Sequence, residues 1–285
     1  MNKKDIKFDE TIKVFYPPIL YFMITVFVEV IAYVILFISR IRKINTNVSS
    51  FVASYSFIDE LSKDVEKYSY LIVFISAFIG IFVFGYLYYK DCRIVKGFSV
   101  KEQFEFGNPK YIVIVVVFGF FASTGLSRFV SLLPLDDILG NYDTVSDSLL
   151  NGSLLLQIIS VGIAVPIAEE LIYRGLVFNR MKNSMDIKVA AVITSLLFGI
   201  FHFNLLQGVY AFLLSLLLIY CINFYNSIIP SIIIHSIANI SAVLLSYFNV
   251  SDIFGNSIWV YILIMAVEFI IAALIFILCM VDNER

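Results

Sequence analysis

Residues 153–178 read SLLLQIISVGIAVPIAEELIYRGLVF, an apolar run long enough to cross a lipid bilayer. A helix rises about 1.5 Å per residue and the hydrocarbon core is about 30 Å thick, so about 20 residues suffice. Late in the run stand two adjacent glutamates, Glu169 and Glu170, and an arginine, Arg174. Charged groups within such a run cost about 3 kcal/mol each on insertion, and for that reason they mark functional sites by default.

Other apolar runs of similar character flank this one. They cover residues 15–39, 69–89, 111–133, 187–204, 208–225, 228–248 and 258–281. With 60% hydrophobic residues and a mean hydropathy of +0.93, the chain lies outside the range of soluble domains. Backbone polar groups must be paired inside hydrocarbon, so each run is expected to be helical. We predict an all-α fold: one integral membrane domain over residues 1–285, a polytopic bundle of about eight transmembrane helices.

The loops between the runs differ in charge. One loop, 90–110, is rich in basic residues, whereas loop 134–152 has none and carries aspartates. The residues concerned are Lys90, Arg93, Lys96, Lys101 and Lys110 in the first loop, and Asp136, Asp137, Asp143 and Asp147 in the second. Lys and Arg accumulate in cytoplasmic loops. Eight spans then put both termini in the cytoplasm of a multi-pass protein of the cell membrane. The mixed-charge segment 57–68 is expected to lie along the membrane surface.

Charge and cysteine usage exclude some classes of function. The formal net charge is −2, which provides no basic field for nucleic acid. The three cysteines, Cys92, Cys221 and Cys279, have neither CxxC nor CxxH spacing. We therefore expect no disulfide framework and no thiolate zinc site. The lipid bilayer is the expected surrounding, and the oligomeric state stays open.

The chain has two histidines, His202 and His235, and both lie in apolar runs. Phe198 and His202 are four residues apart on the fifth predicted helix, and His235 and Asn239 are four apart on the seventh. Residues with this spacing share one helix face. Counted from the cytoplasmic ends, these residues and Glu169 lie at similar depths. They are predicted to converge on one buried cavity among helices four to seven.

A carboxylate, two imidazoles and a carboxamide suit hydrolysis of an amide bond. Glu169 can take a proton from water as general base, and His202 can hold that water. His235 and Asn239 can donate hydrogen bonds to the oxyanion of a tetrahedral intermediate. Glu170 and Arg174 share a face and can pair, which would orient the site.

An alternative hypothesis is a metal site formed by some of the same residues. Glu169, His202 and His235 could bind zinc, with water in the open position. The HExxH pattern of many zinc hydrolases is missing from the sequence, so the favoured mechanism requires no cofactor.

Three motifs in order, EExxxR, FxxxH and HxxxN, resemble those of the CAAX-processing and bacteriocin-processing (CPBP) family of intramembrane proteases. Glu169, Glu170 and Arg174 match the first motif; Phe198 and His202 match the second; His235 and Asn239 match the third. The resemblance covers about residues 150–250, the predicted protease core. It implies an intramembrane endopeptidase whose Glu169 activates water with His202, while His235 and Asn239 form the oxyanion site.

The family includes the type II CAAX prenyl endopeptidases of eukaryotes. Bacterial members resemble processing or self-immunity proteins for bacteriocins and peptide pheromones. The resemblance therefore implies a membrane-associated peptide or protein as substrate.

Two hypotheses from other classes of function stay open. The chain could be a non-catalytic membrane scaffold or immunity protein, or a proton-coupled transporter that uses the buried carboxylate as a relay. Arg128 and Glu29 are further charges in apolar runs outside the motifs. Arg128 is expected to reach the outer membrane interface, and Glu29 to pair within the bundle or face water.

Overall fold

The computed structural model describes residues 3–42, 55–94, 100–105, 110–133, 153–250 and 257–283. Within these ranges the chain forms helices and no strand, which confirms the predicted fold class. Seven helices are long and apolar enough to span a membrane. The four aspartates of loop 134–152, together with Lys96, lie outside the described residues.

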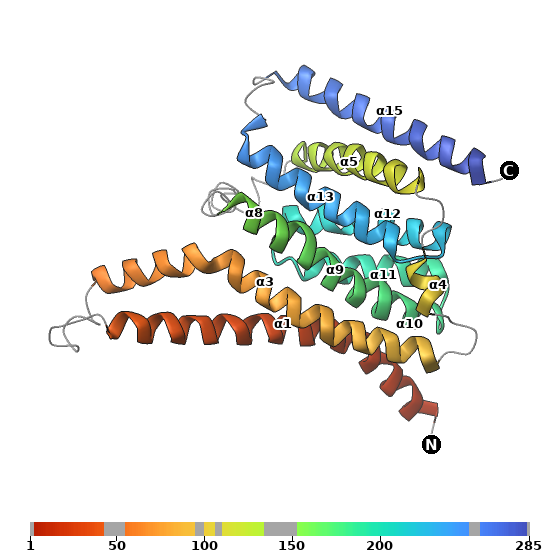
Figure 1. Cartoon of the computed structure of the whole chain (residues 1–285). Coiled ribbons are helices and arrows are strands. Elements are labelled where there is room, and N and C mark those ends of the chain that lie inside the picture. The colour runs from red at the N-terminus through yellow and green to blue at the C-terminus, as the bar shows by residue number, and fades with distance from the viewer. Residues whose placement is uncertain are drawn as a thin grey trace.

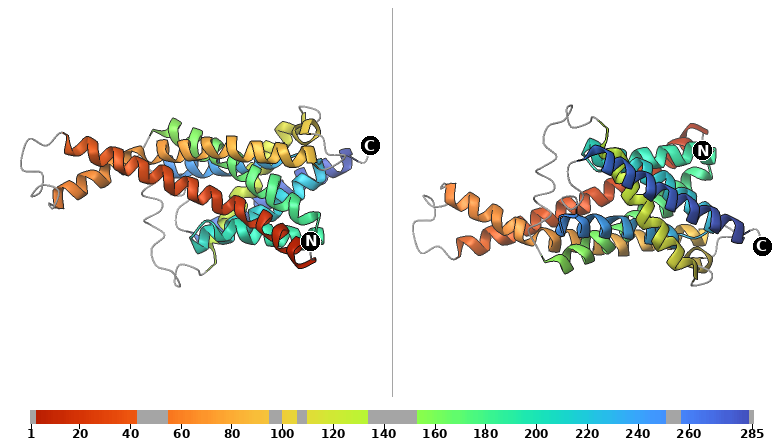
Figure 2. Two further views of the ribbon diagram at one scale, coloured as in Figure 1. Left: turned by 90° about the horizontal axis from the view of Figure 1, so that it is seen from below. Right: turned by 90° about the horizontal axis from the view of Figure 1, so that it is seen from above.

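The first two long helices form a hairpin that extends beyond the rest of the bundle (Figure 1, Figure 2). They are α1 (Lys3–Ile41) and α3 (Tyr55–Ile94). The segment 57–68 belongs to α3, so the expectation that it lies along the membrane surface was wrong. The reason is pairing with α1: Phe57 packs edge-on against Phe37 at 5.6 Å, and Arg40 Nε donates to Asp64 Oδ2 at 2.6 Å.

Another group of helices comprises α5 (Lys110–Ser131), α13 (Ile229–Tyr247) and α15 (Ile258–Asn283). The short α4 (Val100–Phe104) precedes α5. Arg128 on α5 does not reach the outer interface as expected. Its Nε donates to Glu268 Oε2 on α15 at 3.0 Å, and both side chains are largely buried. An intramembrane cation is stabilised better by a carboxylate within reach than by stretching toward water.

The segment Leu154–Lys182 is helical throughout but not uniformly wound. It comprises α8 (Leu154–Gln157), η1 (Ile158–Ala164), α9 (Val165–Glu170), η2 (Leu171–Phe178) and α10 (Asn179–Lys182). The segments η1 and η2 are π-helical. Pro166 has no N–H, and the N–H of Val165 donates five residues back to Ser160. Wide π turns thus flank the glutamate pair, a geometry found frequently at functional sites.

The fifth predicted span is shorter than its apolar run. Helix α11 covers Ile187–Ile200, and α12 covers Leu205–Tyr225. Fourteen residues reach about 21 Å, less than the hydrocarbon core. The helix ends early because Phe203 has a left-handed φ of 53° and the Asn204 side chain caps α12. His202 therefore lies in a tight turn and not, as predicted, inside the helix.

The hairpin of α11 and α12 depends on the close approach of two glycines. A Cβ atom on Gly199 would lie 2.6 Å from the carbonyl oxygen of Gly208. Backbone cannot rotate away as a side chain can, so Gly199→Ala is expected to destabilise the fold by about 1–3 kcal/mol. Unfolding in mixed micelles measures the effect.

Gly85 on α3 provides the matched control. A Cβ atom there would meet one atom, Leu171 Cδ1, at an ordinary 3.9 Å. Gly85→Ala is therefore expected to leave stability unchanged or raise it by up to about 1 kcal/mol, because alanine favours helix. Equal losses from both variants would contradict the close-approach argument.

The long helices run back and forth along the bundle. The first and the last described residues therefore lie on the same side of it (Figure 1, Figure 2). The segment Leu154–Lys182 packs against α3 on one side and α13 on the other. This arrangement puts the glutamate pair at the centre of the bundle.

Candidate active site

The centre of the site is a buried ion pair. Arg174 Nη1 donates to Glu170 Oε1 at 2.8 Å, and both side chains are fully buried. The pairing expected from the EExxxR spacing is present. A buried carboxylate so close to a guanidinium is stabilised in its ionised form.

His235 joins this pair from α13. Its Nδ1 lies 2.8 Å from Glu170 Oε1, the same oxygen that accepts from Arg174. Since an ionised carboxylate only accepts hydrogen bonds, Nδ1 carries the proton. Glu170 therefore fixes the orientation of the His235 ring, a contact that helix spacing alone does not reveal.

The other ring nitrogen of His235 faces Glu169. Nε2 lies 3.6 Å from Glu169 Oε2, which is longer than a direct hydrogen bond. The Glu169 side chain is 17% exposed, whereas that of Glu170 is sealed. The two adjacent glutamates thus differ: Glu170 anchors the histidine, and Glu169 has access to the space beside it.

Phe198 contacts residues of all three motifs. Its ring stands edge-on to His202 at 4.8 Å and to His235 at 5.6 Å. The Arg174 guanidinium lies 4.7 Å from its centroid, and Tyr173 packs edge-on at 4.8 Å. Both imidazoles therefore lie beside one buried aromatic ring.

His202 and Asn239 lie at the border of this cluster. His202 Nδ1 is 2.7 Å from the Phe198 carbonyl oxygen, so Nδ1 donates and the neutral ring keeps a lone pair on Nε2. Asn239 Nδ2 donates to the Val161 carbonyl of η1 at 2.9 Å. Within the described chain, no hydrogen bond or ion pair connects either residue to Glu169.

The predicted zinc ligands do not form a ligand set in this arrangement. Among the described residues, no group of three or more His, Cys, Asp or Glu side chains is placed to hold a metal ion. Glu170 holds His235 Nδ1, so the lone pair of the neutral ring is on Nε2, which lies 3.6 Å from Glu169 Oε2. No step below uses a metal ion.

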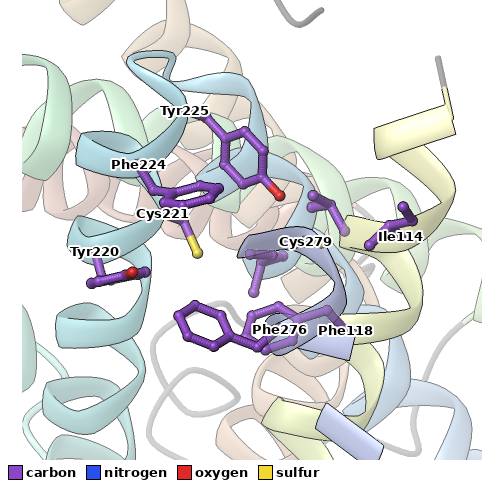
Figure 3. Close-up of a pocket in the computed structure, with 10 residues that line it drawn as sticks. Ile114, Phe118, Tyr220, Cys221, Phe224, Tyr225, Phe276 and Cys279 are labelled. Atoms are coloured by element: carbon purple, nitrogen blue, oxygen red, sulfur yellow. The ribbon is translucent and has the colours of Figure 1, made fainter. Parts of the chain in front are cut away.

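A separate small apolar pocket lies among α5, α12, α13 and α15. Figure 3 shows Cys221 of α12 and Phe276 of α15 beside the same space. None of its described lining residues is an acid or a histidine. Ile234 lines it, whereas the next residue, His235, points to the glutamates, so the two sites use different faces of α13.

Comparison with known proteins identifies the central part of the chain. Residues 151–241 match the family model described as type II CAAX prenyl endopeptidase Rce1-like. This segment is similar to that family. It contains all three motifs, and the resemblance expected from them is confirmed. The match supports an intramembrane protease at the level of the family.

A curated relative also matches part of the chain. The UPF0177 protein YxdF of Lactococcus lactis subsp. lactis (strain IL1403) is 30% identical to the chain over 131 residues. That stretch is 46% of this chain and 65% of the relative, which is just under two thirds of its length. No solved structure matches the chain significantly. The assignment to a protease family therefore rests on the match over residues 151–241.

The sequence analysis did not single out two residues that the structure brings to attention, Tyr21 and Glu268. Tyr21 of α1 packs edge-on against Phe84 at 5.9 Å and would meet any Cβ atom on Gly80, beside Ala168. No local pattern distinguishes it from the other tyrosines. Glu268, the partner of Arg128, could have been found, because it is the one acid within the run 258–281 apart from the terminal turn.

Proposed function

We propose that the chain is an intramembrane endopeptidase that cleaves a membrane-associated peptide or protein with water activated by Glu169. The observation that carries the proposal is the contact between Glu169 and an anchored His235. Two atoms 3.6 Å apart can both bind a single water at about 2.8 Å from each. Glu170 and Arg174 hold the imidazole in place for it.

The charges of the cluster suit this role. With both glutamates ionised and His235 neutral, the four side chains carry a net charge of −1. One proton on His235 Nε2 makes the cluster neutral. Glu169 is then an ionised base, and His235 is a hydrogen-bond donor beside it.

The reaction follows from these assignments. The water oxygen attacks the carbonyl carbon of the scissile bond while its proton passes to Glu169. His235 Nε2–H donates a hydrogen bond to the developing oxyanion, and the second amide hydrogen of Asn239 adds to it. When the C–N bond breaks, the proton on Glu169 passes to the leaving nitrogen. His202 Nε2 accepts a hydrogen bond from the attacking water and holds it.

The favoured substrate is a peptide precursor, such as a bacteriocin or pheromone, processed at the cell membrane. The basic loops support an orientation with both termini in the cytoplasm. The mechanism needs no cofactor.

The test compares peptides from cells carrying wild type, Glu169→Ala or His202→Ala. Mass spectrometry of membrane and secreted fractions is expected to find one precursor that accumulates in both variants. Glu105→Ala removes an exposed carboxylate elsewhere in the chain and serves as the control. Resistance to added protease verifies that each variant is folded.

The rival functions predict different outcomes. A scaffold or immunity protein would leave the peptide profile unchanged in folded Glu169→Ala. A transporter would lose proton-dependent flux in vesicles without any change in precursor. Either result would refute proteolysis.

A further inference from the structure

The apolar part of α1 carries one charge on its exposed face. Between Lys13 and Arg40 the sequence has a single acidic residue, Glu29, and no basic residue. Glu29 is exposed, as are Val26, Val30 and Tyr33 beside it. In its most apolar window, only 6% of α1 is buried within the protein. A carboxylate therefore stands in the middle of an otherwise apolar membrane-facing surface.

Glu29 differs from the other charges in the spans. Arg128 pairs with Glu268, Arg174 with Glu170, and Arg180 with Asp91 at 2.6 Å. Within the described ranges, no side chain forms a hydrogen bond or ion pair with Glu29. A lone charge in lipid is unfavourable enough that it indicates a binding partner by default.

The position of Glu29 connects it with the candidate active site. Phe22 lies two helical turns earlier on the same face of α1. Its ring is 5.5 Å from that of Phe203, the residue after His202. Seven residues of helix cover about 10 Å, which an extended peptide spans with about three residues. A chain lying along α1 from the His202 turn would thus reach Glu29 about three residues away.

A second copy of the chain does not fit well as the partner. Among the described basic residues, Arg40, Arg128, Arg174 and Arg180 are each already paired with a carboxylate of the same chain. Contact between two α1 helices about a two-fold axis would bring like charges together. The chemistry that fits is an apolar segment of another molecule that carries a lysine or arginine.

We propose that Glu29 binds a lysine or arginine side chain in the membrane-embedded segment of the substrate, a few residues from the scissile bond. The inference rests on the proposed protease function for the identity of the partner. Only a basic segment can form this ion pair. The pair would therefore select basic segments from the many uncharged helices in the membrane.

Binding of designed peptides tests the proposal. The probes are transmembrane peptides of leucine and alanine with one central lysine, glutamine or glutamate, in phosphatidylcholine vesicles with the full chain. Energy transfer between dyes on peptide and protein measures affinity. Wild type is expected to bind the lysine peptide roughly tenfold more tightly than the glutamine peptide. Glu29→Gln should lose this preference, and Glu29→Lys should transfer it to the glutamate peptide.

Controls separate the possible failures. Glu105→Gln makes the same change in an exposed carboxylate outside the apolar runs and should retain the preference. Equal affinity of wild type for the lysine and glutamine peptides, or a preference that survives Glu29→Gln, would overturn the proposal. Wild type could prefer the lysine peptide while no precursor accumulates in cells with Glu169→Ala. That result would refute the protease function but not the Glu29 site, because binding does not require hydrolysis.

Discussion

Replacing Arg174 by methionine is expected to destabilise the folded protein by about 3–5 kcal/mol. The guanidinium neutralises Glu170, whose side chain is fully buried at the centre of the bundle. Methionine fills much of the same volume but leaves that carboxylate without a counter-charge. It also removes the cation from the face of Phe198. Unfolding in mixed micelles, followed by circular dichroism, measures the loss.

The double variant Arg174→Met, Glu170→Leu shows whether charge is the cause. Removing both partners of a buried pair is often close to neutral, so much of the lost stability should return. Proteolysis should not return with it, because His235 Nδ1 would have no carboxylate to hold it. If the single variant unfolds at the same denaturant concentration as wild type, the ion pair does not stabilise the fold.

The bundle could be predicted from the sequence because the bilayer imposes both length and internal hydrogen bonding. The eight apolar runs correspond to helices in the structure, and the three motifs fall on elements that meet. The early end of α11 could not be predicted from hydropathy, since the run continues to Asn204. Phe203 and Asn204 end it through local backbone geometry and a cap.

Contacts between distant residues were harder to predict than helices. Arg128 and Glu268 are 140 residues apart, and Glu170 and His235 are 65 apart, so no periodicity connects them. Helix spacing predicted that Glu170 could pair with Arg174. It could not indicate that the same oxygen also anchors His235, because that depends on how α9 and α13 pack.

Replacing His235 should slow turnover with little effect on stability. Substitution by asparagine or by glutamine tests the roles of its two ring nitrogens separately. In His235→Asn, the amide nitrogen replaces Nδ1 and can still donate to Glu170, but nothing faces Glu169. Removing one oxyanion donor usually slows hydrolysis about 10²–10³-fold. We expect that loss in the conversion of precursor to product, with stability close to wild type.

In His235→Gln, the amide nitrogen reaches the position of Nε2 and can donate toward the oxyanion. Because His235 acts as a donor in the proposed reaction, this variant should process the precursor faster than His235→Asn. Pulse-chase labelling of the precursor, with mass spectrometry of the product, gives the two rates. Equal and complete inactivity of both variants would indicate that Nε2 accepts a proton from water, which would make His235 the base and reverse its role with Glu169.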